Sequence, residues 1–573
     1  MEENKVEENN EDVELLEDDT EEVSTEETNE VVEETSSEPT ESSVPNQESA
    51  PVAEKQEEKK EPEKKKGSNK GIIILIVVLL VVFLLVGCCL LVLLLNRSKP
   101  KEVDTPSKVT ASQYRLSGNG LEDFDLYFLQ LENSKKNKIY SPLSIKYALA
   151  MLQDGADGET KEQITNLIGD YKPKKYTNSD HMSFANAMFI RNSFKENVKS
   201  DYTTKLQEKY NAEVKYDDFS SPDNINNWVS DKTFNLIDDL VDDVSGNNFF
   251  LINALAIDMN WNNQIQCRVG RTIPCKEYYV NYRHEKYNES VRDVYDNFEK
   301  VSFEGKDVDA GTIGASINKY DIVKELGEDK IRETVGNELK DYINNGGEMC
   351  GITYDQWMDT YITELNSNYK KVDESTDFYL YNNDEVKVFA KDLKEYDGLT
   401  LQYVGIMPTK KDLDTYIKEL DAKKANEIIS NLKDIKLDNF KDGVVTRVKG
   451  SIPFFKYDYE LKLKDDLGTL GIKDAFDINK ADFSPMLGNE KQYIEKALHK
   501  ANIEFSNDGI KAAAATAFGG AGAAGCYVSF DHEYEVPIED IDLTFNKPYM
   551  YIIRDKSTGE VWFAGTVYNP DTK

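Results

Sequence analysis

The chain has 573 residues, with 106 acidic and 69 basic side chains, so its formal net charge at neutral pH is −37. This charge argues against nucleic acid as a partner, because phosphate binding needs clustered Lys and Arg. The 32 Tyr and 24 Phe can supply a sizeable core, and the length suffices for one large domain or several smaller ones.

The N-terminal segment, residues 1–70, is predicted to be a disordered acidic tail with a basic end. Its first 50 residues contain 20 Asp or Glu and one Lys, Lys5, with few large apolar side chains. Such segments stay unfolded because they cannot bury enough apolar surface. A solvated spacer is the simplest interpretation, and a specific docking role is the alternative.

A transmembrane helix is predicted at residues 71–95, which are 25 consecutive uncharged residues rich in Leu, Val and Ile. At 1.5 Å per residue this helix measures about 37 Å, which is enough to cross the hydrocarbon core of a membrane, about 30 Å thick. The helix would then be in contact with membrane lipid. The run is too long, and begins too far into the chain, for a signal peptide. Six Lys precede it between residues 59 and 70, and three basic residues follow it between 97 and 101. This balance predicts a cytoplasmic N-terminus and an extracellular region after Leu95.

A polar stalk, residues 96–112, leads to a globular region that we assign to residues 113–573. The apolar runs 249–257 and 400–407 are typical of buried strands, and the amphipathic runs 141–152 and 225–240 are typical of helices. Because helices come early and strands dominate later, we expect an α+β fold with a large sheet.

Neither enzymatic nor metal-binding chemistry is predicted. The four histidines lack the spacing of metal ligands, no CxxC pair is present, and no GxSxG, HExxH or P-loop motif occurs. We therefore expect no enzyme activity, no cofactor and no metal. Of the six cysteines, Cys88 and Cys89 fall in the predicted span, Cys267 and Cys275 are close enough to pair, and Cys350 and Cys526 have no evident partner.

Several motifs, taken in order, point to one family. Ser141 and Pro142 suit the N-cap and first position of a helix, within a segment that resembles a family signature. The motifs are Asn137–Ile145 (NKIYSPLSI), Gly158–Ile164 (GETKEQI), Ala185–Ile190 (ANAMFI), Leu251–Ala254 (LINA) with Trp261 following, His499–Ala501 (HKA) and Phe545–Arg554 (FNKPYMYIIR). From about residue 121 to 570, the chain resembles the serpins, which are serine protease inhibitors.

The resemblance implies a fold and a set of structural positions. The expected fold has a large central sheet that accepts the reactive-centre loop, smaller sheets and eight or nine helices. Ser141, Ser144, Asn186 and His499 correspond to the shutter, where the central sheet parts, and we expect His499 to bond with Asn186. Trp261 corresponds to the breach, where the loop enters. Taken alone, a buried His or Trp is more simply a core residue.

Residues 507–544 are assigned to the reactive-centre loop, because Asp508–Thr516 (DGIKAAAAT) resembles its hinge. Side chains in a strand alternate between faces. The hinge residues are Gly509, Ile510, Lys511, Ala512, Ala513, Ala514, Ala515 and Thr516. If Ile510 points inward, then Ala512, Ala514 and Thr516 also do, and no charge enters the sheet.

Counting the family's usual interval from Gly509 places the reactive bond at Ala523–Ala524, with Cys526–Tyr527 as the alternative. Small residues suit an elastase-like or subtilisin-like protease, and the absence of Lys and Arg from residues 512–546 disfavours a trypsin-like one. Three features depart from the inhibitory pattern. Ile510 stands where inhibitory serpins carry Ser or Thr, glycines follow the hinge, and the loop is extended. A longer region than the family's, about 300–375, is assigned as an insertion with helical patterns at 322–343 and 356–369.

The resemblance therefore implies a monomeric inhibitor of serine proteases, or alternatively of cysteine proteases. It would act by forming an acyl-enzyme and inserting the cut loop into the sheet. Combined with the predicted anchor, this gives a single-pass membrane protein that displays the inhibitor outside the cell. The alternative is a serpin fold without inhibitory activity that serves as a surface binding protein.

Overall fold

The computed structural model describes residues 111–118, 120–131, 135–169, 171–265, 282–284, 301–370, 372, 377–510, 528, 532 and 534–570. The chain divides into two units, Met1–Lys101 and Glu102–Lys573, and these residues lie in the second. The predicted tail and the predicted span at 71–95 fall outside the described residues. No helix in the described ranges is long and apolar enough to cross a membrane.

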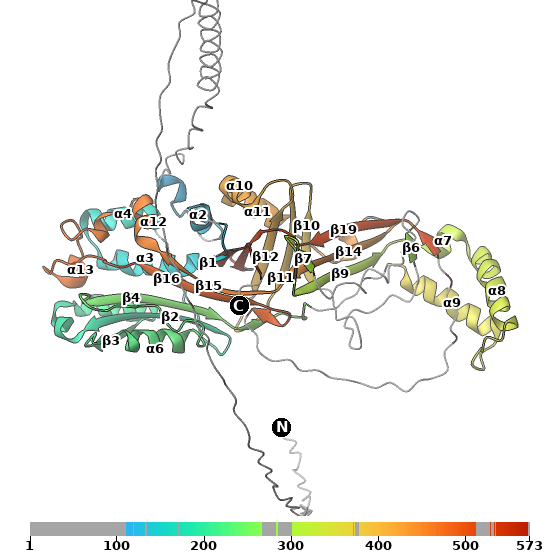
Figure 1. Cartoon of the computed structure of the whole chain (residues 1–573), viewed down its shortest axis with the longest axis horizontal. Helices are drawn as coiled ribbons and strands as arrows, with labels where there is room; N and C mark the ends of the chain where they lie inside the picture. The colour runs from blue at the N-terminus through green and yellow to red at the C-terminus, as the bar shows by residue number, and fades with distance from the viewer. Residues whose placement is uncertain are drawn as a thin grey trace, which may run out of the picture. The chain divides into compact units, whose positions relative to one another are not determined.

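The central sheet consists of two hydrogen-bonded groups of strands (Figure 1). One group has the order β3 (Glu213–Asp217), β2 (Met182–Arg191) and β4 (Phe249–Ile257). The other has the order β15 (Phe455–Lys462), β16 (Leu498–Phe505), β17 (Gly509–Ile510) and β5 (Met259–Asn260). Only Asp258 separates β4 from β5, so a single length of chain connects the two groups.

A second, antiparallel sheet forms much of the main core. Its order is β1 (Lys138–Tyr140), β21 (Val561–Val567), β20 (Tyr549–Asp555), β12 (Leu401–Pro408), β11 (Val386–Asp392), β10 (Phe378–Asn382) and β13 (Lys433–Asp434). All eight residues of β12 are buried, and so are all seven of β21. Burial along the whole of these strands explains why their sequences are continuous apolar runs rather than alternating ones.

A third sheet has the order β19 (Ile538–Thr544), β14 (Val445–Pro453) and β9 (Ala310–Asn318). Strand β14 pairs in parallel with β19 and antiparallel with β9. Two further pairs are β18 (Tyr534–Val536) with β6 (Tyr282–His284), and β7 (Val301–Phe303) with β8 (Lys306–Val308). Strands β18 and β19 lie within residues 507–544, which we assigned to the reactive-centre loop.

Helices pack on both faces of the central sheet, with α3 on one side and α6 on the other (Figure 1). The helices are α2 (Asp123–Leu131), α3 (Pro142–Gly155), α4 (Gly158–Ile168), α5 (Ser200–Tyr210), α6 (Asp223–Lys232), α7 (Ile322–Leu326), α8 (Glu328–Asn344), α9 (Tyr354–Asn368), α10 (Leu413–Glu419), α11 (Ala422–Ser430), α12 (Leu463–Thr469) and α13 (Ser484–Leu487). This exceeds the eight or nine that we predicted, because several are short and α7–α9 fall in the range assigned as an insertion.

The structure confirms most of the predicted elements. The strand at 249–257 is β4, the strand at 400–407 is β12, and the helix at 141–152 is α3, with Ser141 as its N-cap and Pro142 in its first turn. The helix predicted at 225–240 is wrong in its second half, because α6 ends at Lys232. Phe234 and Asn235 have φ of 52° and 58°, which a right-handed helix cannot accommodate.

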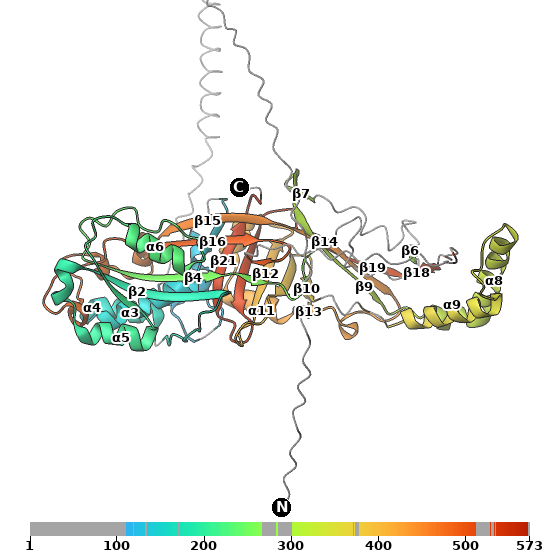
Figure 2. The ribbon, with the colours of Figure 1, turned by 90° about the horizontal axis from the view of Figure 1, so that it is seen from below.

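The range 300–375 contains both strand and helix. Strand β9 pairs with β14 in the third sheet, whereas α7, α8 and α9 lie beyond that sheet (Figures 1 and 2). The helix predicted at 322–343 is divided at Gly327, whose φ is 83°, and the helix predicted at 356–369 is α9. Cys350, between α8 and α9, is disulfide-bonded, so our expectation that it lacks a partner is wrong.

Candidate functional site

The candidate site is a cleft in the central sheet between β4 and β16. In the described residues, β4 pairs only with β2, and β16 pairs only with β15 and β17. The cleft has an empty volume of about 620 Å³, counting space open to solvent. Its walls include Leu251–Leu255 and Leu498–Ala501, and the N-terminal half of α3 forms its floor. The two strands therefore line a cleft without pairing with each other in the described residues.

At one end the two strand groups are joined, and this junction is the predicted breach. Gly509 and Ile510 pair with Asn260 and Met259 of β5. Trp261 is 1% exposed, its indole Nε1 donates to the carbonyl of Ser506 over 3.0 Å, and its ring packs edge-on against Phe505. The structure thus places Trp261 where the chain leaves β16 and enters β17.

Gly509 allows the backbones of β17 and β5 to approach closely at this junction. A Cβ at this position would lie 2.1 Å from the carbonyl oxygen of Met259 and 2.7 Å from the Cα of Asn260. Contacts this short with backbone atoms require the two strands to separate. The hinge glycine is thus needed for close packing of β17 against β5.

Farther along the cleft lies the predicted shutter, at the start of α3. Ser141 Oγ accepts from the N–H of Ser144 over 3.0 Å, and the Ser141 N–H donates to His499 Nε2 over 2.8 Å. Both serines and His499 line the cleft. The link between His499 and Ser141 connects β16 to the floor of the cleft rather than to the opposite strand.

Burial and this hydrogen bond together keep the His499 imidazole neutral. Because Nε2 accepts from a backbone N–H, the ring proton belongs on Nδ1. Loss of solvation lowers the pKa of His499 from 6.5 to about 4. At neutral pH the shutter histidine is therefore uncharged.

Asn186 does not bond to His499 among the contacts of the described residues. It lies on β2, where its Nδ2 donates to the carbonyl of Tyr210 and its Oδ1 accepts from Asn253 Nδ2 over 2.7 Å. Asn253, directly opposite Asn186 on β4, lies between Asn186 and the cleft. The predicted partner of His499 is wrong, because β4 separates Asn186 from β16.

Asn253 is a cleft residue that we did not assign from the sequence. Its Oδ1 is buried and has no hydrogen-bond partner among the residues that the structure describes. A buried amide oxygen without a donor is unfavourable by about 1–3 kcal/mol. Asn253 occurs in the LINA motif, but the motif gives no indication that one of its oxygens lacks a partner.

A segment that follows α6 covers the cleft on the outer side of the sheet. Ile237 and Leu240 line the cleft. Lys500 of β16 pairs with Asp239, and Lys496 donates to the carbonyl of Asp243 over 3.1 Å. Lys500 of β16 and Lys496, which precedes this strand, thus hold the segment that follows α6.

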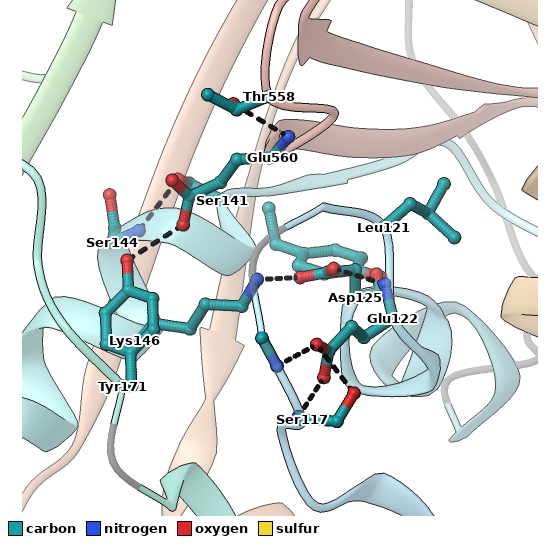
Figure 3. Close-up of polar contacts among 12 residues, drawn as sticks. Ser117, Leu121, Glu122, Asp125, Ser141, Ser144, Lys146, Tyr171, Thr558 and Glu560 are labelled. Carbon is teal, nitrogen blue, oxygen red and sulfur yellow. Dashed lines mark hydrogen bonds and ion pairs between the residues drawn. The ribbon is translucent and has the colours of Figure 1, made fainter.

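Beneath the cleft, α3 is held by a buried ion pair with α2. Lys146 Nζ lies 2.6 Å from Asp125 Oδ1, and the two side chains are 3% and 0% exposed (Figure 3). Burial raises the pKa of Asp125 to about 6, and Lys146 offsets part of this shift. Nearby, Tyr171 OH donates to Glu560 over 2.8 Å (Figure 3). The ion pair fixes the helix whose N-terminus forms the shutter.

Of the predicted hinge, the structure describes only its first two residues. Ile510 is 2% exposed and lies against the cleft wall. The remaining hinge residues, Lys511–Thr516, and both candidate reactive bonds, Ala523–Ala524 and Cys526–Tyr527, lie outside the described residues. No group of His, Cys, Asp or Glu suited to hold a metal ion occurs in the described ranges.

Comparison with known proteins places the chain in a family. The model of the serpin (serine protease inhibitor) family matches residues 124–286 and 368–570. This is more than half of the chain, and the chain therefore belongs to the serpin family.

Individual relatives are distant but span most of the chain. A leukocyte elastase inhibitor of Xenopus tropicalis is 24% identical, over 78% of this chain and 97% of its own length. A neuroserpin of Mus musculus is 25% identical, over 76% and 88% respectively. Among solved structures, thyroxine-binding globulin in complex with thyroxine has a TM-score of 0.50 at 16% identity, over 78% of this chain and 98% of its own. That structural similarity indicates the fold alone.

Proposed function

We propose that this serpin inhibits serine proteases by covalent trapping, with the cut loop inserting into the cleft between β4 and β16. The observation that carries the proposal is the position of β17. It runs antiparallel to both β16 and β5, at the end of the cleft. If the chain continued straight from Ile510, it would enter the cleft as a new strand.

The existing pairs predict the register of the inserted strand. Ile510 is opposite Phe505 on one side and Met259 on the other. In an antiparallel ladder each step forward on one strand is a step back on its partner. Ala512 would then lie opposite Ile503 and Ile257, Ala514 opposite Ala501 and Leu255, and Thr516 opposite His499 and Asn253.

This register gives Thr516 a role at the shutter. Residues 499, 501, 503 and 505 of β16 are buried, so the hinge residues opposite them would also face inward. The Thr516 hydroxyl would come to Asn253 Oδ1, the buried oxygen that lacks a donor. Insertion would thus satisfy a polar group that has no partner in the described part of the chain.

The chemical step belongs to the protease. Its serine would attack the carbonyl of Ala523 and release the amine of Ala524, leaving an acyl-enzyme on the new C-terminus. Insertion of the hinge would then carry the protease away from its docked position before water completes hydrolysis. Small side chains at the bond favour an elastase-like or subtilisin-like target, in keeping with the name of the Xenopus tropicalis relative.

We also propose display of the inhibitor on the outer face of a membrane. The support is the uncharged run at 71–95 and the excess of Lys before it. Protease protection of intact cells tests the orientation. External protease would remove residues after the span and spare the acidic tail.

The test of inhibition is a denaturing gel of the full chain, in detergent micelles, after incubation with elastase. Trapping predicts an adduct that survives SDS, with a mass that locates the bond near Ala523. Two arginine variants test the register. Ala514→Arg places a charge inward and should be cut without forming the adduct, whereas Ala513→Arg, on the opposite face, should form it. Clean cleavage of the unmodified chain would contradict the proposal.

A non-inhibitory binding role is the second candidate, and Ile510 favours it. This bulky residue is already buried against the cleft wall. In a binding protein, Ile510 would close the cleft, and the loop would not begin to insert there. Ile510→Thr distinguishes the two, because adduct formation that appears only in this variant would mean that the natural chain is not an inhibitor.

A further inference from the structure

Helices α7–α9 share a hydrophobic cluster with the C-terminal part of the reactive-centre loop. We call His532 and Tyr534–Val536 the loop arm. Tyr534 and Val536 are 5% and 3% exposed. The cluster is separate from the main core and comprises Ile322, Ile331, Val335, Met358, Ile362, Leu365, Val445, Tyr534 and Val536. The loop arm therefore completes the apolar packing of these helices.

Polar contacts link the loop arm to both long helices. From α9, Tyr361 OH donates to Tyr534 OH over 2.9 Å. From α8, Glu338 Oε2 lies 2.6 Å from His532 Nδ1. The His532 ring also packs edge-on against Tyr534, with ring centres 4.5 Å apart. Each helix thus holds one side chain of the loop arm.

Two features that depart from the serpin pattern therefore meet in space. One is the set of helices α8 and α9, which fall in the part of the chain, residues 287–367, that the family model leaves unmatched. The other is the extended C-terminal part of the loop. A longer loop lowers the probability that a given bond is held in the conformation a protease requires. Packing of the loop arm on α8 and α9, together with the pairing of β18 with β6, removes part of that added freedom.

We infer that α8 and α9 hold the C-terminal arm of the reactive-centre loop and so position the reactive bond, with Tyr361 and Glu338 as positioning residues. The inference rests on the proposed function for the identity of the loop. The loop is held at two described points, β17 on one side and the loop arm on the other. The helices thereby compensate for the length of the loop.

The first test is hydrogen exchange of the free, full-length chain in detergent micelles, with no protease present. Tyr361→Phe removes the hydroxyl contact and keeps the ring, whereas Tyr361→Ala removes both. We expect peptides covering residues 532–536 to exchange about 2- to 10-fold faster in Tyr361→Phe, and faster still in Tyr361→Ala. Peptides from β20 should be unchanged. Thr363→Ala, an exposed position on the same helix, is the matched control.

A double-mutant cycle tests whether the Tyr361–Tyr534 contact is responsible. If it is, Tyr361→Phe and Tyr534→Phe each accelerate exchange, and the double variant exchanges no faster than the single ones. Independent, additive effects, or unchanged exchange in Tyr361→Ala, would overturn the inference.

The positioning role is tested by measuring which bond elastase cuts. A loss of stability alone does not change that bond. We expect elastase to produce one main C-terminal fragment from the natural chain. In Tyr361→Ala and Glu338→Gln, a smaller share of fragments should begin at that bond. An unchanged fragment pattern would overturn the positioning role. Fragment masses can be measured whether or not an adduct forms, so this result is independent of inhibition.

Discussion

The two ends of the central sheet are built differently, and the difference bears on the proposed insertion of the loop. At the breach, backbone pairing of β17 with β5 and β16 joins the two strand groups. At the shutter, β4 and β16 have no such pairing in the described residues, and a cleft lies between them. The breach is thus a completed sheet, and the shutter is an incomplete one held by side chains.

The contacts at the shutter differ in kind from those at the breach. A complete sheet resists insertion, since a new strand can enter only where the ladder is unpaired. At the shutter, the hydrogen bond between His499 and Ser141 and the contacts of the segment after α6 hold the walls of the cleft. Each of these contacts is weaker than a backbone ladder, so under the proposed mechanism the cut loop can displace them.

The largest expected effect comes from cutting the loop without a substitution. Insertion of roughly eight to ten residues adds ladder hydrogen bonds worth about 1 kcal/mol each, a gain on the order of 10 kcal/mol. We expect cleavage between residues 520 and 527, which leaves these residues attached to β17, to raise the temperature of unfolding strongly, as measured by calorimetry before and after treatment. An unchanged transition would mean that the cleft does not accept the loop.

The next effect concerns the histidine at the shutter. Unfolded His titrates near 6.5 and native His499 near 4, so between these values only the unfolded state binds the proton. The free energy of unfolding should therefore fall by about 3 kcal/mol as pH drops from 6.5 to 4. Comparison with His499→Gln isolates the contribution of His499 to the pH dependence of the free energy of unfolding. The Asp125 carboxyl, whose pKa is raised, makes the protein more stable as pH falls, but it is present in both proteins. Equal pH profiles in denaturant titrations would contradict the neutral histidine.

At the breach the most informative change is Gly509→Ala. The added Cβ would overlap the backbone of Met259 and Asn260, so β17 must move away from β5. We expect a loss of about 1–3 kcal/mol in the free energy of unfolding, typical of overpacking. Ala512→Gly, three residues farther along the hinge, is the control. Exchange of the Trp261 amide, followed by NMR, should accelerate in Gly509→Ala.

The sequence predicted the fold better than it predicted the contacts. Strand β4 and helix α3 were recognisable because apolar spacing and capping residues are local signals. The partner of His499 was not, because it depends on which strand lies next to the cleft, and Asn253 of β4 stands between β16 and Asn186. The end of α6 was missed for a related reason. Apolar spacing continues past Lys232, whereas the backbone turns at Phe234 and Asn235.

The smallest effect on stability, with a clear kinetic consequence, is expected from the segment that covers the shutter. Lys500, on β16, pairs with Asp239 across the cleft, whereas Lys456 pairs with Glu504 on the neighbouring strand without crossing it. Lys500→Met and Lys456→Met should each alter the free energy of unfolding by about 1 kcal/mol or less.

Only Lys500→Met removes a contact that must break before insertion. The uncut loop should then insert spontaneously up to about 5-fold faster, the rate equivalent of about 1 kcal/mol. The measurement is the loss of loop cleavage by elastase during incubation at elevated temperature. Equal rates in the two variants would show that the segment after α6 does not limit insertion, and the difference between breach and shutter would then rest on the strands alone.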